Sequence, residues 1–152
     1  MDLGIKGKRA IVCASSKGLG FGCAQALAQA GVDVVLNGRS EESLEAAAEK
    51  LLFGHFNNQT ERYKKRLKGE TPAERAASLA KVREQEGYLS HCEDDEGGLR
   101  IIEHHSPFGE IADKYPSVFR MEEQMFERVL GTSVEREEER ASALVRFVFR
   151  LG

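Results

Sequence analysis

The sequence lacks the features of membrane, secreted and disulfide-stabilised proteins. It has no run of about eighteen apolar residues, which argues against a membrane-spanning helix. Its first ten residues hold no apolar signal segment, so we expect a cytoplasmic protein. Three cysteines without a Cys-x-x-Cys spacing argue against a disulfide framework and a four-thiolate metal site. The net charge is −3 with both signs interspersed, so no basic field points to nucleic acid.

Residues 1–52 have the pattern of a Rossmann-like β-α-β-α fragment. Apolar runs at 8–14 and 32–37 predict two parallel strands buried on both faces. The Ala-rich segment between them predicts a helix that ends at Gly31. Ser40 followed by two glutamates predicts the start of a second helix, which reaches about residue 52. The order and the short connections are typical of a doubly wound α/β fold.

Residues 53–152 have a different pattern, that of an antiparallel α+β unit. Residues 57–68 predict a helix, and Thr71-Pro72-Ala73-Glu74 is a capping box that starts another. We expect hairpins at 87–105 and 133–151, separated by a helix over about 107–130 that is interrupted near Pro116. The fold class is therefore α/β, with a parallel fragment joined to an antiparallel unit. Because the fragment alone exposes apolar faces and open edges, its sheet partner is either the antiparallel half, in one mixed sheet, or a second copy, as a homodimer.

The turn after the first strand is the candidate binding site. Glycines between a buried strand and a helix let the backbone approach a phosphate at the helix N-terminus. Arg39 follows the second strand, where an NAD-binding protein would carry a carboxylate, so a 2′-phosphate and hence NADP is favoured. The alternative is that Lys17 and Arg39 are only solvated surface cations. The predicted cofactor-binding residues are Ser15, Ser16, Lys17, Gly18, Leu19, Gly20, Asn37 and Arg39.

Residues 4–52 resemble the short-chain dehydrogenases/reductases. The stretch Ala10-Ile-Val-Cys-Ala-Ser-Ser-Lys-Gly-Leu-Gly-Phe-Gly-Cys-Ala is similar to that family's glycine-rich turn, TGxxxGxG, with Cys13 and Ala14 in place of the leading Thr-Gly. The resemblance implies dinucleotide binding. Catalysis in that family needs a Tyr-x-x-x-Lys pair, and the three tyrosines here are followed at that spacing by Leu67, Cys92 and Phe119. We therefore expect no catalytic residues and no dehydrogenase activity.

The second half resembles the C-terminal sensor region of winged-helix regulators that control iron–sulfur cluster assembly. Its carrying segments include Leu99-Arg-Ile-Ile-Glu-His-His-Ser-Pro-Phe, Ala112-Asp-Lys-Tyr-Pro-Ser-Val-Phe and Leu130-Gly-Thr-Ser-Val-Glu-Arg. Where cluster-binding members place cysteines, this chain has Ser106, Phe119 and an apolar residue near Val145. Without thiolates a cluster has no ligands, and no winged-helix domain precedes the segment. We therefore expect neither a cluster nor DNA binding.

Three further patterns have plain interpretations. His91, Cys92, His104 and His105 lie on one predicted hairpin, but neighbouring strand residues point to opposite faces, so satisfied or exposed side chains are favoured over a metal site. The alternating charges of 135–140 predict a solvated hairpin or sheet edge. An apolar stripe at helical spacing predicts core or dimer contact, formed by Met121, Met125, Phe126, Val129 and Leu130.

These patterns leave three hypotheses for function. The favoured one is a recombined chain, natural or engineered, that folds from two unrelated fragments and has no enzymatic activity. The second is an NADP- or phosphate-binding module that uses the glycine-rich turn. The third is a degenerate short-chain oxidoreductase, against which the missing Tyr-x-x-x-Lys pair weighs.

Overall fold

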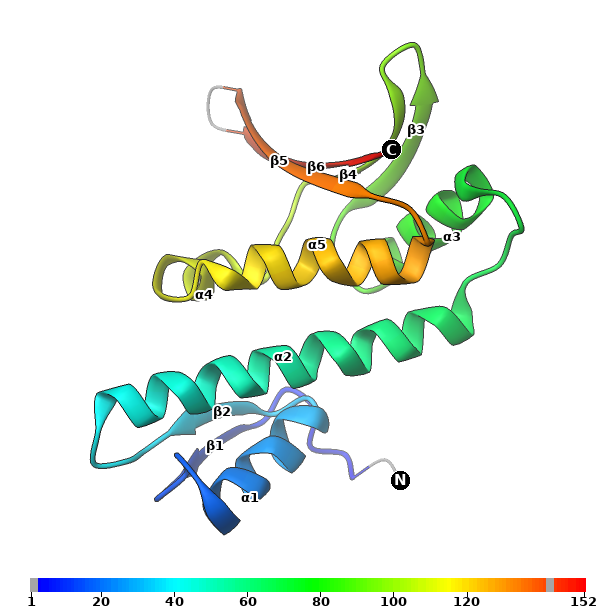
Figure 1. Ribbon diagram of the computed structural model, residues 1–152. Helices are drawn as coiled ribbons and strands as arrows, with labels where there is room; N and C mark the ends of the chain where they lie inside the picture. The colour runs from blue at the N-terminus through cyan, green and yellow to red at the C-terminus, as the bar shows by residue number, and fades with distance from the viewer. Residues whose placement is uncertain (1–2, 142–143) are drawn as a thin grey trace. The chain divides into compact units, whose positions relative to one another are not determined.

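The computed structural model describes residues 3–141 and 144–152 and is an α/β structure of two compact units, Met1–Asn58 and Gln59–Gly152 (Figure 1). Helix α2 (Glu41–Arg66) begins in the first unit and ends in the second. None of the helices in these residues is long and apolar enough to cross a membrane. Residues 142 and 143, inside the predicted 133–151 hairpin, lie outside the described ranges.

The N-terminal unit contains a parallel β-α-β motif. Strands β1 (Arg9–Val12) and β2 (Asp33–Leu36) pair in parallel and are joined by α1 (Gly18–Gln29). Gly31 ends the α1 segment in the left-handed region, with a φ of 80°, as predicted. The predicted motif is thus confirmed, with strands two to three residues shorter than the apolar runs.

The expectation that both strands are buried on both faces is wrong. Their side chains alternate between partly covered and exposed, and the exposed face includes Ile11 and Val35. The reason is that α1 packs on one face of the sheet, and in the described residues no third strand extends it.

The C-terminal unit is built on a four-stranded antiparallel sheet of order β3-β4-β6-β5. Its strands are β3 (Ser90–Asp95), β4 (Gly98–Glu103), β5 (Val134–Ala141) and β6 (Leu144–Leu151). Its remaining helices are α3 (Pro72–Gln85), α4 (Gly109–Lys114) and α5 (Ser117–Leu130). Both predicted hairpins are confirmed, and so is the break before α5 at Pro116. Within the described ranges the two sheets share no strand, so the mixed-sheet alternative is wrong.

One long helix replaces two shorter ones that the sequence predicts. Residues 41–52 and 57–68 were expected to form separate helices, whereas α2 runs continuously to Arg66. The polar residues Asn57–Thr60 do not break it, because Gln59 and Thr60 are buried and the Gln59 amide donates to the Tyr63 and Tyr88 hydroxyls of the C-terminal unit. This tertiary packing overrides the weak helix propensity of these polar residues.

Local capping signals explain where the helices begin. Thr71 Oγ1 accepts a hydrogen bond from the Glu74 amide at 3.2 Å, and a Glu74 carboxylate oxygen accepts one from the Thr71 amide at 3.1 Å. Backbone donors from Thr71 and Glu70 lower the pKa of the Glu74 carboxyl. Ser40 Oγ likewise accepts from the Ser43 amide at 3.3 Å at the start of α2.

The core of the C-terminal unit lies between its sheet and its helices. Four of the five residues of the predicted apolar stripe of α5 are confirmed as core, since Met125, Phe126, Val129 and Leu130 are buried, whereas Met121 is half-buried. Phe126 stacks on Phe149 of β6 with ring centroids 4.0 Å apart.

Candidate functional site

The glycine-rich turn connects the end of β1 to the start of α1. Ala14 adopts a left-handed conformation with a φ of 52°, at the position where the dehydrogenase motif has glycine, and Gly18 has a φ of 61°. Left-handed backbone is costly for alanine and free for glycine. The turn therefore keeps the backbone path of a glycine-rich turn although one of its glycines is replaced.

Gly20 is required by a close approach of two backbones. A Cβ atom at this position would overlap the carbonyl oxygen of Ala14. Its absence lets the first turn of α1 lie directly over the end of β1. The structure thus gives a physical reason for glycine here that spacing alone could not supply.

The N-terminus of α1 is available to a ligand. Lys17 occupies the N-cap position in extended conformation, and its side chain makes no capping hydrogen bond. The first N–H groups of a helix have no partner within it and carry partial positive charge. Beside them, Leu19 is 91% exposed.

Ser15 fastens the turn to the end of β2. Its amide donates to the Asn37 carbonyl oxygen at 2.9 Å, and its hydroxyl oxygen accepts from the Asn37 amide at 2.9 Å. Ser15 is fully buried, so its side chain supports the turn and does not face solvent. Ser16 lies near Gly38, at the same edge of the sheet.

The structure therefore brings the predicted residues to the carboxyl ends of the two parallel strands. Ser15 and Asn37 are hydrogen-bonded to each other, and Arg39, two residues after Asn37, is exposed. Neither Lys17 nor Arg39 forms an ion pair within the described residues. An open sheet edge of this kind, with a helix N-terminus and two cations, has the chemistry to hold phosphate groups.

Two of the three tyrosines are buried in the C-terminal unit. Tyr63 is fully buried, and its hydroxyl donates to a carboxylate oxygen of Glu86 at 2.6 Å. Burial raises the pKa of Tyr63, Arg83 partly opposes this, and the hydrogen bond to Glu86 adds to it. Such a hydroxyl is a poor proton donor near neutral pH. Tyr88 is also buried, with its ring under the guanidinium of Arg83.

A buried charge cluster in the C-terminal unit was missed by the sequence analysis. Arg83 of α3 donates from Nε and Nη2 to both carboxylate oxygens of Glu103, and from Nη2 to Glu122 of α5 at 2.7 Å. Arg136 of β5 lies 3.5 Å from the other Glu122 oxygen and 3.8 Å above the Phe119 ring. The expectation that residues 135–140 are solvated is therefore wrong for Arg136, whose side chain is 7% exposed.

The signal for this cluster was present in the periodicity. Arg83 follows Ala76, Leu79 and Ala80 at core spacing in α3. Glu122 lies four residues after Val118 in α5, and Glu103 and Arg136 each lie two residues after a buried strand residue. A charge at a core position predicts a buried partner of opposite sign, and here each one has it.

The predicted histidine-rich hairpin is only partly correct, because β4 ends at Glu103 and His104 and His105 follow the strand instead of lying on it. The rings of His91 and His104 are stacked, with centroids 5.6 Å apart, and both side chains are exposed. Cys92 points to the other face, and burial, with smaller contributions from Asp94 and Glu93, raises the pKa of its thiol. No three His, Cys, Asp or Glu side chains in residues 3–141 and 144–152 are grouped closely enough to hold a metal ion.

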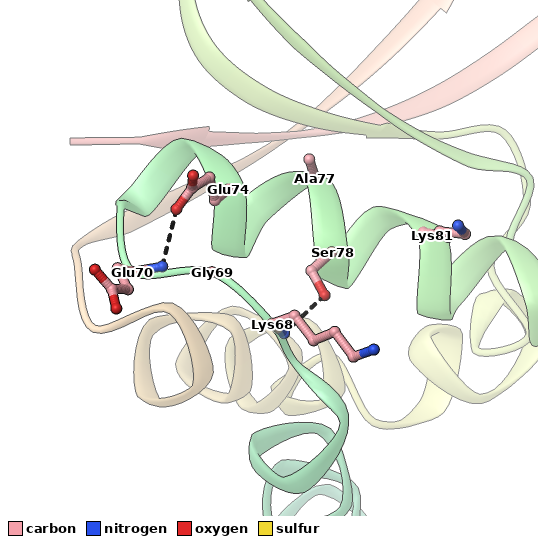
Figure 2. Close-up of a pocket in the computed structure, with 7 residues that line it drawn as sticks. All are labelled: Lys68, Gly69, Glu70, Glu74, Ala77, Ser78 and Lys81. Carbon is pink, nitrogen blue, oxygen red and sulfur yellow. Dashed lines mark hydrogen bonds between the residues drawn. The ribbon is translucent and has the colours of Figure 1, made fainter.

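A surface groove of the C-terminal unit lies between α3 and the connection that leads from α2 into it (Figure 2). The Lys68 amide donates to Ser78 Oγ at 3.0 Å, and the Glu70 amide to Glu74 Oε2 at 2.9 Å, so its polar groups hold the connection between the helices. The groove contains none of the predicted cofactor-binding residues. Its lining consists of Lys68, Gly69, Glu70, Glu74, Ala77, Ser78 and Lys81.

Comparison with known proteins bears on the N-terminal unit alone. No family model matches the chain, and no solved structure matches it. None of these comparisons tests the resemblance of residues 53–152 to winged-helix regulators, which stays a prediction. A segment of 43 residues, 28% of the chain, is 49% identical to gluconate 5-dehydrogenase of Gluconobacter oxydans (strain 621H), and it covers 17% of that protein's length. A short N-terminal segment of this chain is therefore similar to a short-chain dehydrogenase/reductase.

Proposed function

We propose that the N-terminal unit binds the phosphate groups of NADP(H) and that the chain performs no hydride transfer. The observation that carries the proposal is the turn between β1 and α1, whose backbone path, required Gly20 and uncapped helix N-terminus suit a pyrophosphate. The similarity to a dehydrogenase over 43 residues supports the same assignment.

The preference for NADP over NAD rests on the end of β2. Residues 37–39 are Asn-Gly-Arg, with no carboxylate to hold a ribose 2′-hydroxyl. The Arg39 guanidinium is exposed and has no ion-pair partner within the described residues. A free guanidinium recognises a phosphate through two parallel hydrogen bonds, which a 2′-hydroxyl cannot offer.

The absence of hydride transfer rests on the tyrosines. None has a lysine four residues on, and burial raises the pKa of both Tyr63 and Tyr88. A proton donor beside the nicotinamide is thus missing, which argues against the degenerate oxidoreductase.

The alternative is a recombined chain that folds without binding any nucleotide. Two observations favour a junction of unlike segments. The similarity to a dehydrogenase covers 28% of the chain. The two units also have separate sheets, one parallel and the other antiparallel. A recombined origin does not by itself determine whether the chain binds a nucleotide. A binding measurement therefore decides between a chain that binds NADP(H) and one that binds no nucleotide.

The test is a titration of the full chain with NADPH and with NADH, in which binding is monitored by calorimetry and by the fluorescence emission of NADPH. The protein has no tryptophan whose fluorescence would obscure that emission. Arg39→Ala should weaken NADPH binding about tenfold or more and leave NADH unchanged, because one charge-assisted contact to the 2′-phosphate is lost. Lys17→Ala should weaken both dinucleotides.

The matched control is Arg120→Ala, which removes an exposed arginine of α5 and should change neither affinity. Failure of the wild-type chain to bind NADPH more tightly than about one millimolar would contradict the proposal and favour the recombined chain without a ligand.

A further inference from the structure

The outer face of the β1–β2 sheet is an unpartnered apolar surface. Ile11 and Val35 are register partners on this face, and the two residues are 73% and 56% exposed. Parallel sheets are normally covered on both faces, and a two-stranded sheet is marginal by itself. Something is therefore expected to cover this face.

The charges beside the apolar pair indicate what covers it. Arg9 and Asp33 are the next register partners on the same face, and both are exposed. Although opposite charges at this spacing commonly pair, Arg9 and Asp33 form no ion pair with each other or with other described residues. The patch thus has a free cation on one strand and a free anion on the other.

We propose that this face, defined by Arg9, Ile11, Asp33 and Val35, is the contact surface of a homodimer. A twofold axis that runs parallel to the strands, midway between β1 and β2, exchanges the two strands. Arg9 of one copy then faces Asp33 of the other, and Ile11 faces Val35. Both charge pairs and both apolar pairs are then satisfied in one isologous contact.

Known sheet packing permits this arrangement. Two sheets that pack face to face keep their strands within about 30° of each other at a separation of about 10 Å. The patch lies on two strands of only four residues each. The area it can bury is therefore far smaller than the roughly 800 Å² per partner of a stable complex. The dimer is therefore weak and reversible. It does not rest on nucleotide binding, because the phosphate-binding turn lies at the strand ends and not on this face.

The first test is sedimentation equilibrium of the full chain from about ten micromolar to about one millimolar. Wild-type protein should associate to a dimer at the upper end. Ile11→Glu should weaken the dimer about tenfold or more by placing a charge against the partner's Val35. The control Leu144→Glu makes the same change at a 74% exposed leucine of the C-terminal unit and should have no effect.

The second test uses charge reversal and does not depend on how Ile11→Glu folds. Arg9→Asp and Asp33→Arg should each abolish self-association, because each homodimer then opposes like charges. An equimolar mixture of the two variants should associate within about threefold of wild type, since both intermolecular pairs are again opposite in sign. Association that is restored only in the mixture requires contact between the two variants, because an effect within a single chain would be the same in the mixture as in each variant alone.

Three results would overturn the proposal. If the wild-type chain stays monomeric at a protein concentration of about one millimolar, another partner or the C-terminal unit of the same chain covers the face. A dimer unaffected by Ile11→Glu uses another surface. A mixture no more associated than either variant alone excludes the Arg9–Asp33 pairing.

Discussion

Arg83 holds together three elements of the C-terminal unit through its single guanidinium. It belongs to α3, and its partners Glu103 and Glu122 lie on β4 and α5. Its planar group also stacks over the Tyr88 ring at 3.6 Å. The net value of a buried ion pair is small because desolvation offsets the attraction, but removing one partner leaves the others buried and uncompensated.

Replacement of Arg83 by methionine should therefore destabilise the C-terminal unit by about 3–5 kcal/mol, measured by urea unfolding followed by circular dichroism. The loss should be smaller at pH 5 than at pH 8. Burial already raises the pKa of Glu103, and Arg83 opposes that rise. Without Arg83 the carboxyl is more readily protonated, and the neutral form needs no cation.

The sign of this pH effect follows from proton linkage. A carboxyl whose pKa is higher in the folded protein than in the unfolded chain binds its proton more tightly when folded, so its contribution declines as the pH rises through the folded value. Arg75→Met serves as a control, because Arg75 donates to the Val129 carbonyl oxygen and faces no buried carboxylate in the ion pairs of the described residues. An Arg83→Met loss that is equal at both pH values would contradict the account.

At the scale of elements, the capping box of α3 gives the clearest energetic prediction. Thr71→Ala removes the acceptor for the Glu74 amide and should lower the free energy of unfolding of the C-terminal unit by about 1 kcal/mol, while Thr71→Ser should keep most of it. Hydrogen bonds from backbone amides lower the pKa of Glu74. Its contribution is thus present above the ordinary pKa of a glutamate and is lost as the pH falls through the lowered value. Equal stability of the alanine and serine variants would rule out a role for the hydroxyl.

Elements defined by local chemistry could be predicted from the sequence. The Thr71-Pro72 start of α3, the Gly31 stop after α1 and the Pro116 break each depend on residues within one helical turn. The turn residues of the candidate site were predictable for the same reason, because strand, turn and helix are contiguous along the chain.

Features that depend on distant residues could not be predicted. The pairing of β4 with β6 joins residues about 47 apart on average in sequence, as Ile102 and Val148 show, and no local pattern encodes it. Continuity of α2 past Gly54 depends on where Gln59 and Thr60 are buried. The exposure of Ile11 and Val35 could not be read from an apolar run, which looks the same whether one face or two are covered.

At the scale of the whole molecule, the two units differ in how much structure supports each sheet. The N-terminal sheet has two short strands with one face exposed, whereas the C-terminal sheet has four strands over a core that includes Ile101, Phe126 and Phe149. Buried apolar area is the main favourable term in folding, so the first sheet should open at a lower free energy than the second.

Hydrogen exchange followed by mass spectrometry measures this difference directly. We expect amides of β1 and β2 to exchange at least about tenfold faster than those of β4 and β6, because local opening of the small sheet costs less free energy.

Saturating NADPH should slow exchange in β1, the turn and α1, and leave β4 and β6 unchanged, since a ligand stabilises the state that binds it. Protein concentration should have a separate effect: at concentrations where the dimer forms, exchange should slow in β1 and β2 of the wild type but not of Ile11→Glu. Uniform protection of all four strands without ligand would contradict the assignment of two units with different stabilities.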